Sequence, residues 1–254
     1  MSTVIVLFLT GFWLFSAYIQ VHLSRAYIYN PNHTQNITRI ISECGSGEFA
    51  PNSYEAFKSA ANEPSFGGIL ADIGVTKDGV FVCVSSDRPF EDRSISVSGS
   101  NYNDIKELFL FSEKSSAKSR LCLLSDFLSV CYEHMKTAII RFEFGLSDEL
   151  VRRLLGETSP NGGSGVIFCS HTLTYAEKLY KSNSRTNFFV YASGSLSAYC
   201  LGRMGNHFAV KLSGLKESVV KRAHEKNEYV YVYGVKTAEE IERARKLNAD
   251  YIFI

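Results

Sequence analysis

The sequence lacks both a large net charge and the polar composition of a disordered chain. Its 254 residues include 27 Lys and Arg against 26 Asp and Glu, which leaves a formal charge of +1 at pH 7. Nucleic-acid-binding proteins normally carry a basic excess, so we expect no nucleic-acid partner. Because 45% of the residues are hydrophobic and 13% are aromatic, most of the chain is expected to fold. The length fits one large domain or two small ones.

The sequence also lacks paired cysteines. None of the six forms a CxxC pair or has the spacing of a metal-ligand set. Several lie within apolar runs, where a buried free thiol is the simplest interpretation. One or two disulfides stay open if the compartment is oxidising. The six residues are Cys44, Cys83, Cys122, Cys131, Cys169 and Cys200.

Charged side chains are absent from residues 2–23, the longest apolar run in the chain. About 20 apolar residues cross a bilayer as a helix, so we interpret residues 1–24 as a transmembrane anchor. The first alternative is a cleaved signal peptide, although no Lys or Arg precedes the run. A buried helix of a soluble protein is the second alternative. In the first two cases the chain is expected to enter the secretory pathway, either membrane-bound, for example at the cell surface, or secreted.

Residues 25–38 follow as a linker or stalk. They contain two tripeptides of the type that accepts N-linked glycans, beginning at Asn32 and Asn36. Such tripeptides suit a lumenal or extracellular segment. The sequence therefore predicts a glycoprotein whose membrane contact is made by the N-terminal segment.

Strand-like and helix-like segments alternate along residues 39–254, which we interpret as one domain. Alternation of this kind predicts a parallel sheet. Residues 45–49 (GSGEF), after the first strand, lack the spacing and the lysine of a nucleotide-binding loop. We therefore expect an α/β fold with a closed (β/α)8 TIM barrel rather than a doubly wound sheet. Counting one hairpin as a unit, the eight predicted strands are 39–42, 68–84, 137–144, 165–169, 187–191, 207–211, 229–232 and 251–254. The predicted helices are 53–61, 103–111, 123–134, 148–155, 173–181, 196–204, 216–225 and 238–246.

Segments from residue 39 to the C-terminus follow the motif order of a known family. Residues 41–45 (ISECG) and 50–57 (APNSYEAF) stand where that family has a His-Arg-Gly and then a Pro-Glu-Asn-Thr motif. Residues 71–82 (ADIGVTKDGVFV) match its second strand and hairpin, and residues 87–108 match its small insertion. In this order the segments resemble the glycerophosphodiester phosphodiesterases, which are TIM barrels of the PLC-like phosphodiesterase type.

The resemblance implies hydrolysis of a phosphodiester, such as a glycerophosphodiester or a lysophospholipid. In this family two histidines act as general acid and base. Carboxylates hold a divalent cation, Mg²⁺ or Ca²⁺, that neutralises phosphate charge. Such chemistry needs side chains that titrate near neutral pH and oxygen ligands for the hard cation.

Most of these catalytic residues are replaced in this chain. The positions of the two catalytic histidines hold Glu43 and Ser85, and the phosphate-binding Arg is replaced by Cys44. A serine does not titrate near neutral pH, and an ionised Glu43 would repel phosphate. Asn52 replaces the Glu of the second motif, and Tyr233 replaces a Trp near the pocket.

Of the three metal-binding carboxylates, the first is replaced by Leu70, while Asp72 and Glu143 are retained. The Lys two residues beyond the last of these is Gly145. Our main hypothesis is therefore a pseudoenzyme that keeps the barrel for binding a phospholipid-derived ligand or for scaffolding. A second hypothesis is a diverged metal-dependent phosphodiesterase of lipid metabolism. A third is an interaction module tethered to a membrane.

The second hypothesis depends on three carboxylates at the ends of barrel strands. Glu43, Asp72 and Glu143 could together coordinate Mg²⁺ or Ca²⁺. The plainer alternative is that Glu43 is solvated and Asp72 pairs with a nearby Lys or Arg. His171, at a strand end, is a candidate substitute for a lost proton carrier, although an ordinary hydrogen-bonded His is the simpler interpretation. Asn52, Lys211 and Tyr233 are candidate substrate-binding residues.

Overall fold

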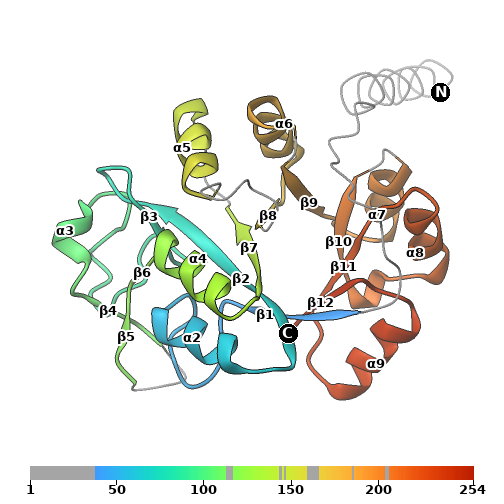
Figure 1. Cartoon of the computed structure of the whole chain (residues 1–254), viewed down its shortest axis with the longest axis horizontal. Coiled ribbons are helices and arrows are strands. Elements are labelled where there is room, and N and C mark those ends of the chain that lie inside the picture. Colours follow the sequence, from blue (N-terminus) through green and yellow to red (C-terminus); the bar gives the residue numbers. More distant parts are fainter. Residues whose placement is uncertain are drawn as a thin grey trace, which may run out of the picture.

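Eight parallel strands close into a barrel in the computed structural model of the chain (Figure 1). The structure describes residues 38–112, 117–142, 145, 147–158, 166–184, 186–203 and 206–254. Each strand pairs with its neighbour, and the last pairs with the first, so that the barrel is closed. Around the barrel the strands are β1 (Arg39–Glu43), β2 (Phe66–Val75), β7 (Thr137–Arg141), β8 (Val166–Ser170), β9 (Asn187–Tyr191), β10 (His207–Lys211), β11 (Val230–Tyr233) and β12 (Tyr251–Phe253).

Helices between the strands form the outer layer. Their boundaries follow local signals: the hydroxyl of Ser53 accepts from the backbone of Ala56 at the start of the first helix, and Thr237 and Glu240 form a capping box at the start of the last. The helices of this layer are α2 (Tyr54–Asn62), α4 (Leu124–Glu133), α5 (Asp148–Thr158), α6 (Leu173–Ser182), α7 (Ser195–Arg203), α8 (Glu217–His224) and α9 (Ala238–Lys246). A short 3-10 helix, η1 (Leu212–Gly214), precedes α8.

A small lobe extends from the barrel where β2 continues into a hairpin with β3 (Phe81–Cys83). The turn between them is possible because Gly79 has a positive φ of 82°, which residues with a Cβ rarely adopt. The other elements of the lobe are α3 (Tyr102–Ile105), β4 (Phe109–Leu110), β5 (Ser119–Arg120) and β6 (Cys122–Leu123).

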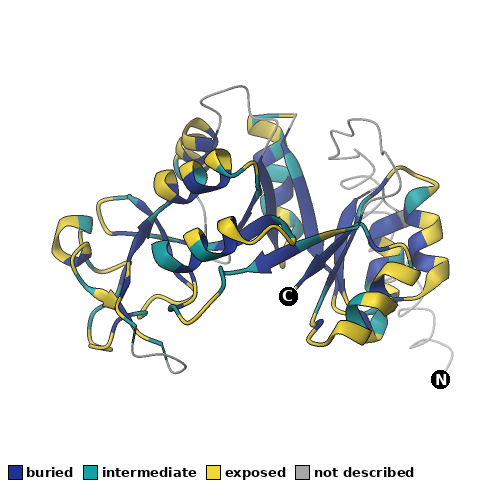
Figure 2. Cartoon of the chain, turned by 60° about the horizontal axis from the view of Figure 1, so that its bottom comes forward, coloured by how far each residue is buried: buried dark blue, intermediate teal, exposed yellow. Residues whose placement is uncertain are grey.

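The apolar core has separate inner and outer layers, as expected for a filled barrel. The inner layer is largely aromatic: Phe189 stacks on Tyr231, and Tyr231 stacks on Tyr251, with ring centroids 4.0 and 4.5 Å apart. The outer layer lies between the sheet and the helices. Figure 2 shows the strands as buried and the helices as exposed on the sides that face away from them. A third cluster, which includes Phe90 and Val97, fills the hairpin lobe.

The predicted barrel and its eight-strand order are confirmed, and seven of the eight predicted helices occur close to their expected positions. The predicted helix 103–111 is wrong in its second half, because α3 ends at Ile105. Leu110 instead pairs with Ser119 in β4–β5 and is buried in the lobe, so a contact between distant residues overrides the helical pattern.

The predicted anchor at residues 1–24 lies outside the described residues, as do the acceptor asparagines Asn32 and Asn36. Among the described residues, no helix has the length and apolar composition needed to cross a bilayer. All six cysteines are described, and each has a free thiol in this structure.

Candidate functional site

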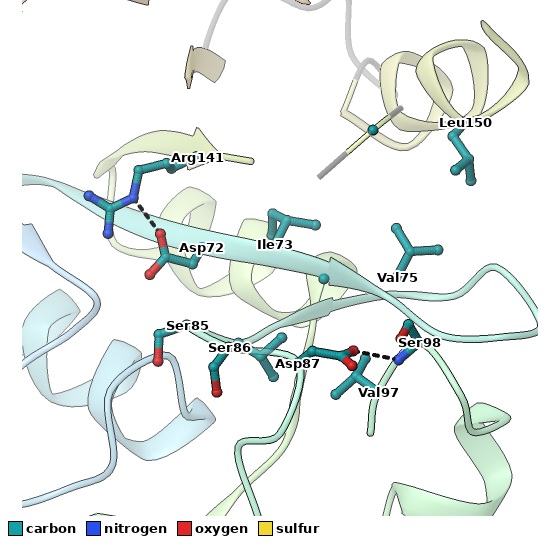
Figure 3. Close-up of a pocket in the computed structure, with 13 residues that line it drawn as sticks. Asp72, Ile73, Val75, Ser85, Ser86, Asp87, Val97, Ser98, Arg141 and Leu150 are labelled. Atoms are coloured by element: carbon teal, nitrogen blue, oxygen red, sulfur yellow. Dashed lines mark hydrogen bonds and ion pairs between the residues drawn. The ribbon is translucent and has the colours of Figure 1, made fainter. Parts of the chain in front are cut away.

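The guanidinium of Arg141 lies at the mouth of the barrel, where it is shared by two carboxylates. Its Nε donates to Oδ1 of Asp72 at 2.5 Å, and its Nη1 donates to Oε1 of Glu43 at 2.6 Å. Figure 3 shows the pair formed by Arg141 and Asp72. These two side chains are only 16% and 15% exposed, whereas Glu43 is 36% exposed. The cluster therefore contains one positive and two negative charges, partly shielded from water.

Strand register explains why these three residues meet. Glu43 and Arg141 are the last residues of β1 and β7, and Asp72 lies in the C-terminal half of β2. These are three neighbouring strands of the barrel. Asp72 is in register with Arg141, two residues beyond the pair formed by Leu70 and Ile139. Side chains alternate along a strand, and the latter pair fills the barrel interior. The ionic residues therefore continue the inward-facing rows at the open end of the barrel.

The side chain of Asn52 forms two hydrogen bonds with Asp72. Its Nδ2 donates to Oδ2 of Asp72 at 3.1 Å, and its Oδ1 accepts from the backbone N–H of Asp72 at 2.8 Å. Asn52 is fully buried and has a positive φ of 63°, a conformation that Asn tolerates better than most residues. The amide side chain thereby extends the hydrogen bonding of β2 beyond the end of β1.

We expect the change Asn52→Ala to lower the free energy of unfolding by about 2–4 kcal/mol. The variant leaves the N–H of Asp72 without its acceptor. It also puts alanine, which tolerates a positive φ less well than asparagine does, at a position where φ is 63°. Urea denaturation of the purified chain measures this loss. Asn52→Gly removes the same hydrogen bonds but accepts the backbone conformation, so it should lose less. An alanine variant as stable as the glycine variant would contradict this account of the backbone.

The cysteine next to Glu43 is a hydrogen-bond donor in this cluster. The thiol of Cys44 donates to Oδ2 of Asp72 at 3.2 Å. Burial raises the pKa of Cys44 well above its ordinary value, and the charge of Asp72 raises this pKa further. The residue is therefore a neutral thiol at physiological pH and lacks the thiolate form that acts as a nucleophile.

Arg141 stays charged in this environment. Burial alone would lower the pKa of Arg141, but the hydrogen bond and the charge of Asp72 outweigh this effect and raise the pKa above its ordinary value. Tyr191 also contacts the guanidinium, with its hydroxyl 3.3 Å from Nη1, and burial raises the pKa of this phenol. None of Cys44, Arg141 and Tyr191 is poised to exchange a proton near neutral pH.

The described residues do not fit a divalent cation. Two of the three carboxylates predicted to hold Mg²⁺ or Ca²⁺, Glu43 and Asp72, are bound to Arg141. In the described part of the chain, no group of three His, Cys, Asp or Glu residues is arranged to hold a metal ion. The third predicted ligand, Glu143, lies outside the described residues. The plainer expectation is confirmed for Asp72, which pairs with Arg141, and is wrong for Glu43, which pairs with the same arginine instead of being only solvated.

The other predicted site residues lie around Tyr191 or along the hairpin. The exposed ring of His171 stacks on Tyr191 with centroids 4.5 Å apart, and Tyr233 meets the same ring edge-on at 5.3 Å. Lys211 is exposed at the end of β10, in register with Tyr233. Ser85 is exposed just after β3. The structure thus brings Glu43, Cys44, Asn52 and Asp72 together.

Arg141 was missed by the sequence reasoning, which assigned no role to it. The available signal was a single charged residue at the end of the otherwise uncharged run 137–141 (TAIIR). A charged side chain at the C-terminal end of a barrel strand points into the mouth of the barrel when it lies on the same face of the strand as the inward-facing residues. The sequence does not identify its partners, because they come from two other strands.

A pocket of about 620 Å³ adjoins the cluster. It lies between the hairpin, the end of β7 and the start of α5 (Figure 3). Ser85 and Ser86 lie on the side of the ionic cluster, whereas Asp87 and Ser98 lie beside Val97, among the apolar side chains (Figure 3). Its described lining residues are Asp72, Ile73, Gly74, Val75, Val84, Ser85, Ser86, Asp87, Val97, Ser98, Arg141, Gly145 and Leu150.

Comparison with known proteins identifies the fold. No protein-family model matches the sequence, and no curated protein matches it. Among solved structures, a putative glycerophosphoryl diester phosphodiesterase from Silicibacter pomeroyi matches with a TM-score of 0.73 at 14% identity, over 91% of this chain and 93% of the other. A putative glycerophosphodiester phosphodiesterase from Galdieria sulphuraria has a TM-score of 0.71 at 16% identity, over 87% and 94%.

A phosphodiesterase from Oleispira antarctica, solved in complex with the product sn-glycerol-3-phosphate, matches with a TM-score of 0.71 at 15% identity. The match covers 90% of this chain and 94% of the other. These similarities agree with the family resemblance of the sequence motifs. The chain therefore has the TIM-barrel fold of the glycerophosphodiester phosphodiesterases.

Proposed function

We propose that this chain is a hydrolytically silent, glycerophosphodiester phosphodiesterase-like barrel that binds a phospholipid-derived ligand beside a membrane. The single observation that supports this most is the position of Arg141 between Glu43 and Asp72. Membrane attachment is supported by the uncharged run of residues 2–23. In this proposal the barrel is retained as a rigid frame for a binding site.

The ionic cluster opposes hydrolysis in two ways. A divalent cation would have to displace a guanidinium that is held by two short hydrogen bonds, and the displaced charge would lie within the same partly buried site. The guanidinium is also unavailable to a phosphate while both carboxylates hold it. Transition-state charge on a phosphodiester would therefore meet no uncommitted cation within this cluster.

The proposal also rests on the replacement of the groups that would transfer protons. The predicted positions of the general acid and base hold Glu43, which is bound to Arg141, and Ser85, which has no titratable group near neutral pH. Losing one member of a catalytic unit costs orders of magnitude in rate. The loss of both histidines together with the occupation of the cation site favours binding without turnover.

An assay of the purified full chain tests this proposal. We expect no detectable release of product from glycerophosphocholine or lysophosphatidylcholine with Mg²⁺ or Ca²⁺, at a sensitivity at least about a thousandfold below a common enzyme rate of ~1 s⁻¹. An active enzyme of the same fold, assayed in the same buffer, serves as the positive control.

Hydrolysis at enzyme-like rates would instead support the alternative, a diverged phosphodiesterase. The variants Glu43→Gln and His171→Ala would then assign the reaction. Activity lost in either variant and retained in the exposed-surface control Glu225→Gln would place the reaction at the barrel mouth. Such a result would overturn the proposed function.

A further inference from the structure

The pocket beside the ionic cluster has an amphiphilic lining. Its apolar wall is built from the hairpin, from the loop between β3 and α3 and from the first turn of α5, and its members are Ile73, Val75, Val84, Val97 and Leu150. At the other end lie Ser85 and Ser86, whose hydroxyl groups point away from β2 (Figure 3). The volume of about 620 Å³ is within the usual range of small-molecule sites, about 300–1,000 Å³.

The ionisable groups of this pocket disfavour an anion. Its described lining contains two carboxylates, Asp72 and Asp87, and one cation, Arg141. The cation is bound to Asp72 and also to Glu43. Oδ1 of Asp87 accepts from the backbone N–H of Ser98 at 2.8 Å, so this carboxylate is fixed beside Val97 in the pocket wall (Figure 3). These groups together carry an excess of negative charge.

We infer that the pocket binds an uncharged single-chain amphiphile of the monoacylglycerol type. Its hydroxyl groups would lie near Ser85 and Ser86, and its acyl chain would cover the apolar wall. This inference rests on the proposed function, because it assumes a lipid-derived ligand that is bound without hydrolysis. It deepens that proposal by naming the class of ligand.

Two contributions to the binding free energy favour a monoacylglycerol over a phosphate-bearing lipid. Removing an acyl chain from water contributes about 25 cal/mol per Å² of apolar surface buried, whatever the headgroup. A phosphate must in addition lose water beside the carboxylates of Asp72 and Asp87, or break the bonds of Arg141 to obtain a partner. A hydroxyl headgroup avoids this cost, since serine hydroxyls and carboxylates are its ordinary hydrogen-bond partners.

Photo-crosslinking of the purified full chain in detergent tests the inference. The probe is a monoacylglycerol with a diazirine in its acyl chain, and labelled peptides are located by mass spectrometry. We expect labels within residues 73–98, at Gly145 and within residues 147–153. Unlabelled 1-oleoylglycerol should compete at least tenfold more effectively than oleoyl lysophosphatidic acid. A tenfold difference corresponds to about 1.4 kcal/mol of binding free energy.

Matched glycine variants provide the control. Gly145 lines the pocket, and a Cβ added there would have no heavy atom within 4 Å; the same is true of Gly156, on an exposed part of α5 outside the lining. Gly145→Trp should reduce labelling at least tenfold, whereas Gly156→Trp should leave it unchanged. If Gly145→Trp does not fold, Leu150→Glu provides the same test, because it places a charge in the apolar wall.

The outcomes separate this inference from the proposed function. Equal or better competition by lysophosphatidic acid, labels outside the pocket, or labelling that survives the pocket variants would overturn the choice of ligand. The absence of hydrolysis would still stand in that case. Conversely, product release in the hydrolysis assay would overturn the proposed function even if the pocket variants abolish labelling.

Discussion

The change Arg141→Ala is expected to lower the free energy of unfolding by about 3–5 kcal/mol, a typical cost of breaking a buried ion pair. The variant leaves Asp72 and Glu43 without their shared cation, and Asp72 is only 15% exposed. Two carboxylates that no longer have a partner between them repel each other and have lost part of their hydration. Urea denaturation of wild type and variant, under identical conditions, measures the difference.

The same variant tests whether the arginine occupies a cation site. With the guanidinium removed, Ca²⁺ or Mn²⁺ gains access to the oxygens of Glu43 and Asp72. Either ion at millimolar concentration should raise the melting temperature of Arg141→Ala by several degrees and leave wild type unchanged, because binding to the folded state alone stabilises it. Equal shifts in both proteins, or none in the variant, would contradict the idea that the guanidinium replaces a metal ion.

A surface arginine is the matched control. Arg153 on α5 donates to the carbonyl of Gly79 and pairs with no buried carboxylate in the described part of the chain. Arg153→Ala is expected to change stability by less than about 1 kcal/mol and to show no response to divalent cations. If Arg153→Ala loses as much stability as Arg141→Ala, the loss in Arg141→Ala cannot be attributed to the ionic cluster.

The change Glu228→Gln is expected to stabilise the protein by about 2–4 kcal/mol at pH 8 and by much less at pH 5. Glu228 is fully buried just before β11, and neither carboxylate oxygen has a hydrogen-bond partner among the described residues. Burial raises the pKa of Glu228 to about 9, an effect that the charge of Lys226 only partly opposes.

The sign of this effect follows from proton binding. Between the ordinary pKa of glutamate and a pKa of about 9, the folded protein holds a proton that the unfolded chain has released. Stability is therefore complete below about pH 4.5, falls as the pH rises through this window, and reaches its minimum above pH 9. Each pH unit costs at most about 1.4 kcal/mol. Glutamine has no proton to lose, so its advantage grows with pH.

Urea denaturation of Glu228→Gln and wild type at pH 5 and pH 8 checks this prediction. Glu225→Gln, an exposed residue of the same segment, removes the same formal charge without a buried carboxyl group and should differ from wild type by less than about 0.5 kcal/mol at either pH. A Glu228→Gln variant whose advantage does not increase with pH would show that the carboxyl group is ionised, and therefore paired, in the folded protein.

The sequence predicted the elements of the barrel well where each depends on local pattern. Apolar runs such as 187–191 and 207–211 are short, uncharged except at their ends and separated by amphipathic segments, so their type and order follow from periodicity. The helix at 238–246 has matching boundaries because its signals, a Thr-to-Glu capping box and a basic last turn, are local. The lobe was predicted less well, since Leu110 pairs with Ser119 across a loop.

The candidate site also combines features that follow from local sequence motifs with contacts that only the fold creates. Sequence motifs predicted Glu43 and Asp72 at the ends of barrel strands, gave Asn52 as a candidate substrate-binding residue and predicted that both catalytic histidines are replaced. They gave no role to Arg141, whose partners lie 69 and 98 residues away along the chain. Spacing within a sequence does not encode distances between strands that are brought together by barrel closure.

The sequence by itself therefore determined the order of strands and helices and the residue types at the expected catalytic positions, because periodicity, caps and motifs act over short stretches of chain. The tertiary structure alone decided what those residues do to one another. Closure of β1, β2 and β7 side by side places a guanidinium between two carboxylates. Electrostatic interaction depends on distance in space, and only the folded barrel sets that distance.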